Sequence, residues 1–232
     1  MPAIDPIMDA LSACARTASP ALAIDAPVYA EAGRDPFSPI VLGSGAIDAR
    51  IGFFGRDPGR TEVLRGEPFI GAGGRKVRDA LHRAAFAVDA PDEEAAVRVG
   101  RAVFWANTVP FKPVGNKAWS VPVQRRFAPA MASLVLNTWT GGDLITLGNA
   151  AFAWIGLVEP RLVPELEALW ARPDRYEASL ALEVAGRALR LHPLPHPSPL
   201  NATWYKRVPA LLDARLAALG WPNADERARI RA

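Results

Sequence analysis

Cysteine and histidine are scarce in this chain. Its 232 residues include one cysteine, Cys14, and three histidines. A single cysteine cannot close an intramolecular disulfide, and it leaves no C-x-x-C pair for zinc or an iron–sulfur cluster. His192 and His196 are four residues apart, but the prolines between them exclude a metal-binding pair on a helix. We therefore expect no metal and no other cofactor, and a reducing compartment such as the cytoplasm.

Long apolar runs are also missing. No stretch approaches the roughly 18 uninterrupted apolar residues that a membrane span requires. Residues 1–20 lack the basic region that opens a secretion signal. We expect a protein that stays in the cytoplasm, without a membrane partner. Because 50% of the residues are hydrophobic, the chain can bury a substantial core, and its length suits one domain better than two.

Acidic residues are absent from two segments. Residues 95–142 and 184–212 contain no Asp or Glu, although the whole chain carries a net charge of only +3. The basic residues in these segments are Arg98, Arg101, Lys112, Lys117, Arg125 and Arg126, then Arg187, Arg190, Lys206 and Arg207. A basic surface without nearby carboxylates suits a phosphate backbone. Solvated helix faces would give the same pattern, so charge alone leaves both interpretations open.

Four short apolar runs are the strand candidates. They are rich in β-branched or aromatic residues and are bounded by Gly, Pro or Asn. They comprise residues 50–55, 102–109, 143–148 and 188–195. Helical patterns separate them, which predicts a central, mainly parallel four-stranded sheet with helices on both faces. The expected fold class is α/β, a three-layer α/β/α sandwich, in a single domain of residues 1–232 with residues 1–48 packed on it as an N-terminal extension.

The helices are expected at 75–88, 122–139 and 149–158. The apolar stripe of the first consists of Val77, Leu81, Ala84 and Val88. His82 falls with Arg75 and Arg78 on its polar face, so His82 is expected to face solvent. Pro209 interrupts the C-terminal helical pattern and predicts a break there.

Three segments rich in glycine and polar residues follow strand candidates directly. They are GRDPGRTEVLRGEPFIGAGGR (55–75), NTVPFKPVGNKAW (107–119) and HPSPLN (196–201). Open α/β sheets bind their ligands at the carboxyl ends of strands, so these segments are the natural candidates for a site.

At these segments the chain resembles the uracil-DNA glycosylase superfamily. GRDPG resembles the first motif of the family, PFIGAGGR and NTVPFKPVGN resemble segments of its iron–sulfur branch, and HPSPL resembles its His-Pro-Ser motif. All the motifs occur in the family's order, over roughly residues 50–216. The resemblance implies an α/β/α enzyme that excises uracil from DNA.

The chain also departs from the family at informative positions. Phe111 stands where the iron–sulfur branch has a cysteine, and Cys14 alone cannot replace four ligands, so we expect no cluster. Arg56 replaces the usual Gln or Glu. Gly59 replaces the bulky tyrosine with which the metal-free uracil-excising branch excludes thymine, so base selectivity is left open.

Cleavage of an N-glycosidic bond separates charge, with the negative charge on the departing base and the positive charge on the sugar. His196 suits the role of hydrogen-bond donor to uracil O2. Asp57 suits the sugar side, where it would stabilise the oxocarbenium-like sugar and orient or deprotonate water. Glu62 and Glu67 are the alternative acids. These roles would fail if Asp57 and His196 lay on unrelated surfaces, too distant to share one cavity.

Base recognition needs an acceptor and a donor side by side, because uracil presents O4 beside N3–H. The amide of Asn107 offers both, and Phe69 would stack on the flipped ring. Gly55 of the first motif completes this substrate-binding set by resemblance. A strand-terminal turn for Asn107 and a core position for Phe69 are the simpler alternatives.

By resemblance, Leu200 is the wedge that fills the gap left by the flipped base, and Ser198 helps to hold a phosphate. Ser198 and Pro199 would equally suit the start of a helix. Lys206 and Arg207 complete the expected DNA-binding set. The partner implied is uracil-containing DNA, bound by a monomer. A catalytically inactive lesion- or single-strand-binding member and a small-molecule hydrolase on the same fold are the alternatives.

Overall fold

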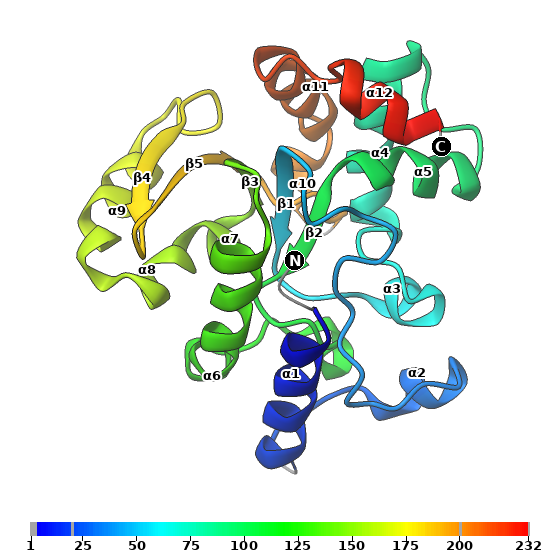
Figure 1. The fold of residues 1–232 in the computed structure, drawn as a ribbon, viewed down its shortest axis with the longest axis vertical. Coiled ribbons are helices and arrows are strands. Elements are labelled where there is room, and N and C mark those ends of the chain that lie inside the picture. The colour runs from blue at the N-terminus through cyan, green and yellow to red at the C-terminus, as the bar shows by residue number, and fades with distance from the viewer. Residues whose placement is uncertain (1–3, 20, 200, 232) are drawn as a thin grey trace.

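The computed structural model describes residues 4–19, 21–199 and 201–231, and it places a sheet at the centre of the molecule (Figure 1). The strands are β1 (Ile51–Gly55), β2 (Phe104–Asn107), β3 (Asp143–Leu147), β4 (Leu180–Val184) and β5 (Arg187–Leu194). Their order across the sheet is β2-β1-β3-β5-β4. Within this order β2, β1, β3 and β5 pair in parallel, and β4 runs antiparallel to β5 at the edge.

Helices cover both faces of this sheet. In the first half of the chain they are α1 (Asp5–Ala18), α2 (Ala26–Glu31), α3 (Arg60–Arg65), α4 (Ala72–Phe86), α5 (Glu93–Val99) and α6 (Val121–Ala132). In the second half they are α7 (Asn149–Ala153), α8 (Ile155–Val158), α9 (Val163–Ala171), α10 (Ala202–Tyr205), α11 (Val208–Ala218) and α12 (Ala224–Arg231). No described helix is long and apolar enough to cross a membrane.

Two hydrophobic clusters fill the space between sheet and helices. Adjacent residues of a strand point to opposite faces, so Phe54 lies in one cluster and Phe53 in the other. The cluster of Phe54 includes Leu11 of α1 and Phe127 of α6, whereas that of Phe53 includes residues of α4 and α11. The α/β fold with a mostly parallel, doubly covered sheet is therefore confirmed.

The sheet has five strands where the sequence predicts four. The additional strand, β4, forms a hairpin with β5 through Ala185 and Gly186, both with positive φ, as a tight two-residue turn requires. Only alternate residues of β4 are buried, so it lacks the continuous apolar run that marks the four central strands. An edge position and a turn without Asn or Asp explain why the pattern was too weak to predict.

The helix predicted at 75–88 spans Ala72–Phe86 and is oriented differently from the prediction. Ala87 ends it in a left-handed conformation, so Val88 lies outside the helix and is 58% exposed. Its carbonyl turns back and lies 2.7 Å from Nδ1 of His82, which is buried and not in solvent as predicted. Arg78, expected on the polar face, is also fully buried.

The remaining helix predictions hold with shifted ends. The segment 122–139 is α6 followed by a π-helical stretch, Ser133–Thr138, and 149–158 divides into α7 and α8. The break expected at Pro209 occurs between α10 and α11, and Pro209 lies in the first turn of α11, where a missing N–H is harmless.

The N-terminal segment is attached to the loop that follows β2. Lys112 is buried, and its ammonium donates to the Asp25 carboxylate at 2.7 Å. The backbone N–H of Lys112 donates to the hydroxyl of Tyr29, and Ile24 pairs with Pro113. Residues 24–29 thus hold the loop that leads away from Asn107.

Candidate active site

The strand order brings the predicted segments to one edge of the sheet. Gly55 at the end of β1 is in register with Asn107 at the end of β2, and Leu147 at the end of β3 is in register with Leu194 of β5. Because these strands are parallel, the loops that leave them lie side by side. The strand that follows β1 in the chain, β2, lies on one side of it, and the next strand, β3, lies on the other side. Open α/β sheets place their ligands at such a reversal of strand order.

Gly55, Phe69 and Asn107 form one compact cluster. A Cβ atom at Gly55 would lie 2.6 Å from Oδ1 of Asn107 and 2.7 Å from Cζ of Phe69. Both side chains therefore cover the backbone of Gly55, and both are buried. Among the described residues, none hydrogen-bonds to the amide of Asn107. Its donor and acceptor are thus uncommitted.

Phe69 is held in a strained backbone conformation. Its φ is 56°, which a bulky residue rarely adopts. The carbonyl of Phe69 accepts a hydrogen bond of 2.8 Å from Nε of Arg78, and the carbonyl of Pro68 accepts one of 2.7 Å from Nη2. The ring stacks on Trp105 with 5.0 Å between centroids. The buried arginine and the tryptophan therefore fix this aromatic ring.

The two alternative acids are occupied elsewhere. Glu67 pairs with Arg78 at 2.6 Å and accepts hydrogen bonds from the backbone and hydroxyl of Ser44. Glu62 accepts hydrogen bonds from the backbone N–H groups of Gly59 at 3.0 Å and Gly71 at 2.9 Å. Both carboxylates tie loops together, so Asp57 is the acid with the fewest structural duties.

Asp57 is buried against Arg56. Its side chain is 4% exposed, Nε of Arg56 donates to its Oδ2, and Nη2 of Arg56 lies 3.3 Å from its Oδ1. Burial raises the pKa of the Asp57 carboxyl above its ordinary value, and this outweighs the opposing attraction of Arg56 and of Lys112. The charge of the Glu62 carboxylate adds to the rise.

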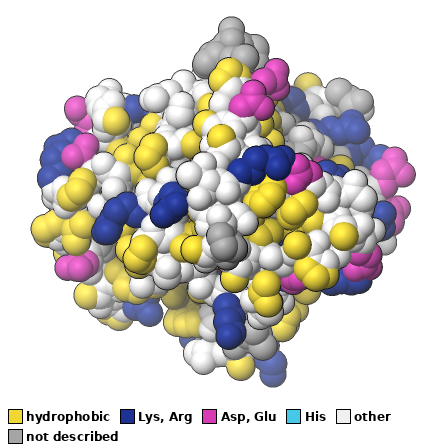
Figure 2. Space-filling view, turned by 90° about the horizontal axis from the view of Figure 1, so that it is seen from below, with side chains coloured by type: hydrophobic (Ala, Val, Ile, Leu, Met, Phe, Trp, Pro, Cys, Tyr) yellow, Lys and Arg dark blue, Asp and Glu magenta, His cyan; other side chains and the backbone are white. Residues whose placement is uncertain are grey.

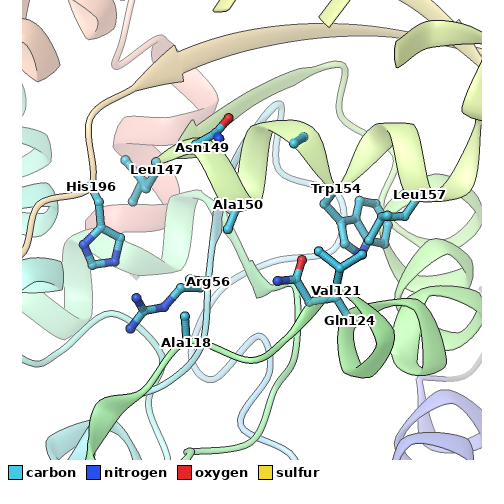
Figure 3. Close-up of a pocket in the computed structure, with 12 residues that line it drawn as sticks. Arg56, Ala118, Val121, Gln124, Leu147, Asn149, Ala150, Trp154, Leu157 and His196 are labelled. Carbon is cyan, nitrogen blue, oxygen red and sulfur yellow. The ribbon is translucent and has the colours of Figure 1, made fainter. Parts of the chain in front are cut away.

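A cavity of about 440 Å³ opens beside this pair. Arg56 and His196 line the same end of it, with the imidazole and the guanidinium on opposite sides of one opening (Figure 3). Most of the remaining lining is apolar and consists of Val121, Leu147, Ala150, Ala153, Trp154 and Leu157. Among the described residues of the lining, none is acidic and Arg56 is the only cation.

His196 is held close to the end of β3. Gly148 has φ of 90°, and a Cβ atom there would lie 3.0 Å from Cβ of His196, so only glycine lets the two loops approach this closely. Burial, together with the nearby charge of Arg56, lowers the pKa of His196 to about 4. The imidazole is therefore neutral at physiological pH, with one N–H to donate.

The expected partners are linked, but not in the way predicted. Asp57, Phe69 and Asn107 do not line the cavity that contains His196. Arg56 connects the two parts of the site, because it lines the cavity of His196 and at the same time pairs with Asp57. Sequence reasoning noted Arg56 only as a departure from the family pattern and gave it no role. Its position next to Asp57 was the available signal.

Comparison with known protein families adds an independent finding. The model of the uracil DNA glycosylase superfamily matches residues 42–220, more than three quarters of the chain. The chain belongs to the uracil DNA glycosylase superfamily. A search of curated proteins finds no match.

In the superfamily's His-Pro-Ser segment, His196 and Ser198 are half-buried and Pro197 is buried, and the short helix α10 follows. The helix α10 begins at Ala202 with Asn201 before it, so Ser198 is not the helix cap that its sequence would also suit. The side-chain amide of Asn201 donates to the carbonyl of His196 at 3.2 Å. Lys206 and Arg207 follow α10 and are exposed. Leu200, the expected wedge, lies outside the described residues.

The iron–sulfur branch of the superfamily does not fit this chain at Phe111. The ring of Phe111 is fully buried and packs on Phe127 with 5.4 Å between centroids, so hydrophobic core occupies the position of the branch's cysteine. No group of three or more His, Cys, Asp or Glu suited to a metal occurs in the described part of the chain.

The predicted basic segments divide between buried and exposed positions. Lys112 is used internally, whereas Lys117, Arg125 and Arg126 are exposed around the part of the chain that lines the cavity. Figure 2 shows a face on which Lys and Arg side chains are scattered among hydrophobic and neutral ones, with acidic side chains mainly toward the margin.

Proposed function

We propose that this protein is a monofunctional DNA glycosylase that flips uracil out of DNA and hydrolyses its bond to deoxyribose. The observation that carries the proposal is the convergence at one sheet edge of an uncommitted amide, a fixed aromatic ring, a buried carboxylate and a neutral imidazole. The superfamily match supports the reaction class, and the assignment of uracil and of each residue is ours.

Base binding is assigned to the cluster at Gly55. Asn107 would donate to O4 and accept from N3–H of uracil, because an amide presents both groups in one plane. Phe69 would stack on the ring, a contact that is worth about 1–3 kcal/mol per base. Its fixed position favours this role, since a preorganised ring loses little freedom when the base arrives.

The chemical step is assigned to Asp57 and His196. The neutral imidazole would donate its N–H toward uracil O2 as negative charge develops there. The carboxylate of Asp57 would stabilise the positive charge on the sugar and orient the attacking water. No metal enters the reaction that we propose.

DNA would approach the loop around Ser198 and the basic residues that follow it. Extrusion of a base costs a few kcal/mol of stacking and pairing, which the wedge proposed at Leu200 would offset. Lys206 and Arg207 would contact phosphates, and we propose that one copy of the chain is sufficient.

The range of bases is part of the proposal. Gly59 lacks the bulky side chain that would exclude a methyl group, which favours a pocket that also accepts hypoxanthine or xanthine. The structure offers a second reason for this glycine: a Cβ atom at position 59 would lie 2.8 Å from Oε2 of Glu62. The loop contact with Glu62 therefore requires a small residue whatever the base.

Excision assays on a panel of oligonucleotides test the proposal. We expect the protein, at catalytic concentration, to convert an excess of uracil-containing DNA to abasic sites, and to act more slowly on hypoxanthine, xanthine and thymine mismatches. Activity confined to uracil would remove the wider base range. Tight binding of uracil-DNA without turnover would instead support an inactive lesion-binding member, an alternative favoured by the pairing of Asp57 with Arg56.

A single methyl group at Gly55 is expected to disable base binding. In Gly55→Ala the new Cβ would lie only 2.6 Å from Oδ1 of Asn107 and 2.7 Å from Cζ of Phe69, so both side chains would have to move away. Displacements near 1 Å in such sites cost about a hundredfold in rate, so we expect kcat/KM for uracil excision to fall about that much. Gly142→Ala is the matched control, because nothing lies within 4 Å of its Cβ position. Excision by Gly55→Ala within about threefold of wild type would contradict the base-binding assignment.

A further inference from the structure

Arg56 has hydrogen-bonding capacity that the described residues do not use. Its Nε and Nη2 contact Asp57, and Nη2 also lies 3.3 Å from the carbonyl of Asn116. Among the described residues, none accepts a hydrogen bond from Nη1. The side chain is 27% exposed, and Arg56 lines the cavity that also contains His196. One edge of the guanidinium is thus fixed and the other remains open.

The surroundings of the open edge favour an anion. The described lining of the cavity contains no carboxylate and no second cation, and most of it is apolar. In such surroundings a guanidinium binds a negatively charged oxygen more strongly than it does in water. The neutral His196 on the other side of the opening adds a second donor without adding charge.

We propose that Arg56 binds an anionic group of the substrate in this cavity through Nη1, while its Nε edge stays on Asp57. The inference deepens the proposed function and depends on it. Two groups of the substrate have the required chemistry, a phosphate beside the flipped nucleotide and the departing base once it carries negative charge. In either case Arg56 is a catalytic residue, and it also positions Asp57.

The two sources of the anion predict different kinetics for Arg56→Gln. Glutamine keeps donors at the position but removes the charge. If the anion is a phosphate, DNA binding weakens about ten- to a hundredfold, and the slope of log affinity against log salt falls by about one. If it is the base, the salt slope is unchanged, kcat falls by a similar factor, and inhibition by free uracil weakens.

A shift of the pH profile is expected in both cases. The charge of Arg56 lowers the pKa of both Asp57 and His196. At Asp57 it acts with Lys112 and against burial and Glu62, whereas at His196 burial lowers the pKa in the same direction. Its removal lets the pKa of both groups rise, so the acid limb of the kcat profile moves to higher pH. Arg56→Lys restores a point charge and should return the limb toward that of wild type. Because the pairing with Asp57 and the charge near His196 already produce this shift, it tests how Arg56 positions Asp57, whereas the salt slope and kcat test the bound anion.

The test compares wild type, Arg56→Gln and Arg56→Lys. For each protein it measures kcat and KM for uracil excision, the dependence of DNA affinity on salt, and the acid limb of the pH profile of kcat. Melting temperatures confirm that each variant is folded. The matched control is Arg172→Gln, which removes an exposed arginine paired with Asp174. If Arg56→Gln is folded and matches wild type in salt slope and kcat, the inference is overturned, whatever happens to the acid limb. If wild type itself excises no uracil, the proposed function fails instead, and an unchanged salt slope of DNA binding in Arg56→Gln then also overturns a phosphate contact.

Discussion

Asp57→Asn is expected to lower kcat for uracil excision by about 10²–10⁴-fold, the usual contribution of a positioned acid or base. Asparagine has the same shape and keeps one oxygen toward Arg56, but it cannot carry the negative charge that stabilises the sugar cation. The variant should bind uracil-DNA about as well as wild type, because Asp57 is not among the proposed DNA contacts. Single-turnover excision and equilibrium binding on the same oligonucleotide separate these quantities.

The stability of Asp57→Asn should move in the opposite direction from its activity. Burial raises the pKa of Asp57 above its ordinary value. A carboxyl whose pKa is higher in the folded state destabilises the fold at any pH above both values, because the charged form is then better solvated in the unfolded chain. Removal of this charge should leave the melting temperature at pH 7 no lower than that of wild type. A loss of activity accompanied by unfolding would not support the assignment.

Two further variants make the assignment specific. Asp174→Asn changes an exposed carboxylate in another Arg–Asp pair and should leave excision unchanged. Glu62→Gln weakens the contacts with Gly59 and Gly71 and should cost stability. If Asp57→Asn stayed within about threefold of wild type while folded Glu62→Gln lost excision, the roles of the two acids would have to be exchanged.

The sequence predicted the central strands well because their burial is local information. β1, β2 and β3 are almost continuous runs of buried residues, and β5 is continuously buried in its second half, which is what a strand covered on both faces requires. The strand order then brings Gly55, Asn107 and His196 to one edge, so the motif residues could be named from the sequence.

Long-range pairing of charges could not be predicted in the same way. Arg78 falls on the polar side of a helical pattern, but it is fully buried because Glu67 and four backbone carbonyls come from other segments to meet it. His82 is buried for a related reason, since the chain reverses at Ala87. A helical wheel shows one helix and contains no information about what packs on it.

The position of Arg56 shows the same limit inside the site. Sequence places Arg56 beside Asp57, and neighbouring residues at a strand end commonly point to different sides. Only the folded loops show that the guanidinium turns back to Asp57 and also reaches the cavity of His196. The chemistry of the motif was therefore predictable, and its electrostatic coupling was not.

His196→Gln is expected to lower kcat by about 10²–10³-fold, the cost of losing a preorganised donor to a developing anion. Glutamine is similar in length and retains an N–H, but its flexible amide is not held in place as the ring is against Gly148. Protonation of His196 should not lower wild-type activity as the pH falls through 6.5, where an ordinary histidine becomes charged, because the pKa of His196 is about 4. His82→Gln, at a histidine outside the cavity, should leave excision unchanged.

The same variant should change the pH dependence of stability. Between pH 6.5 and about 4 the unfolded chain binds a proton at His196 and the folded protein does not, so wild type loses stability as the pH falls through this window. The shift corresponds to about 2–3 kcal/mol after allowance for partial exposure. His196→Gln lacks this loss, so the free energy of unfolding of the variant should gain on that of wild type toward pH 4. Urea denaturation of both proteins at pH 7, 5.5 and 4.5 measures the difference in their free energies of unfolding. The contribution of His192 cancels in this difference, because both proteins contain it. Parallel curves would mean that His196 is not a buried neutral imidazole, and the donor role assigned to it would lose its electrostatic basis.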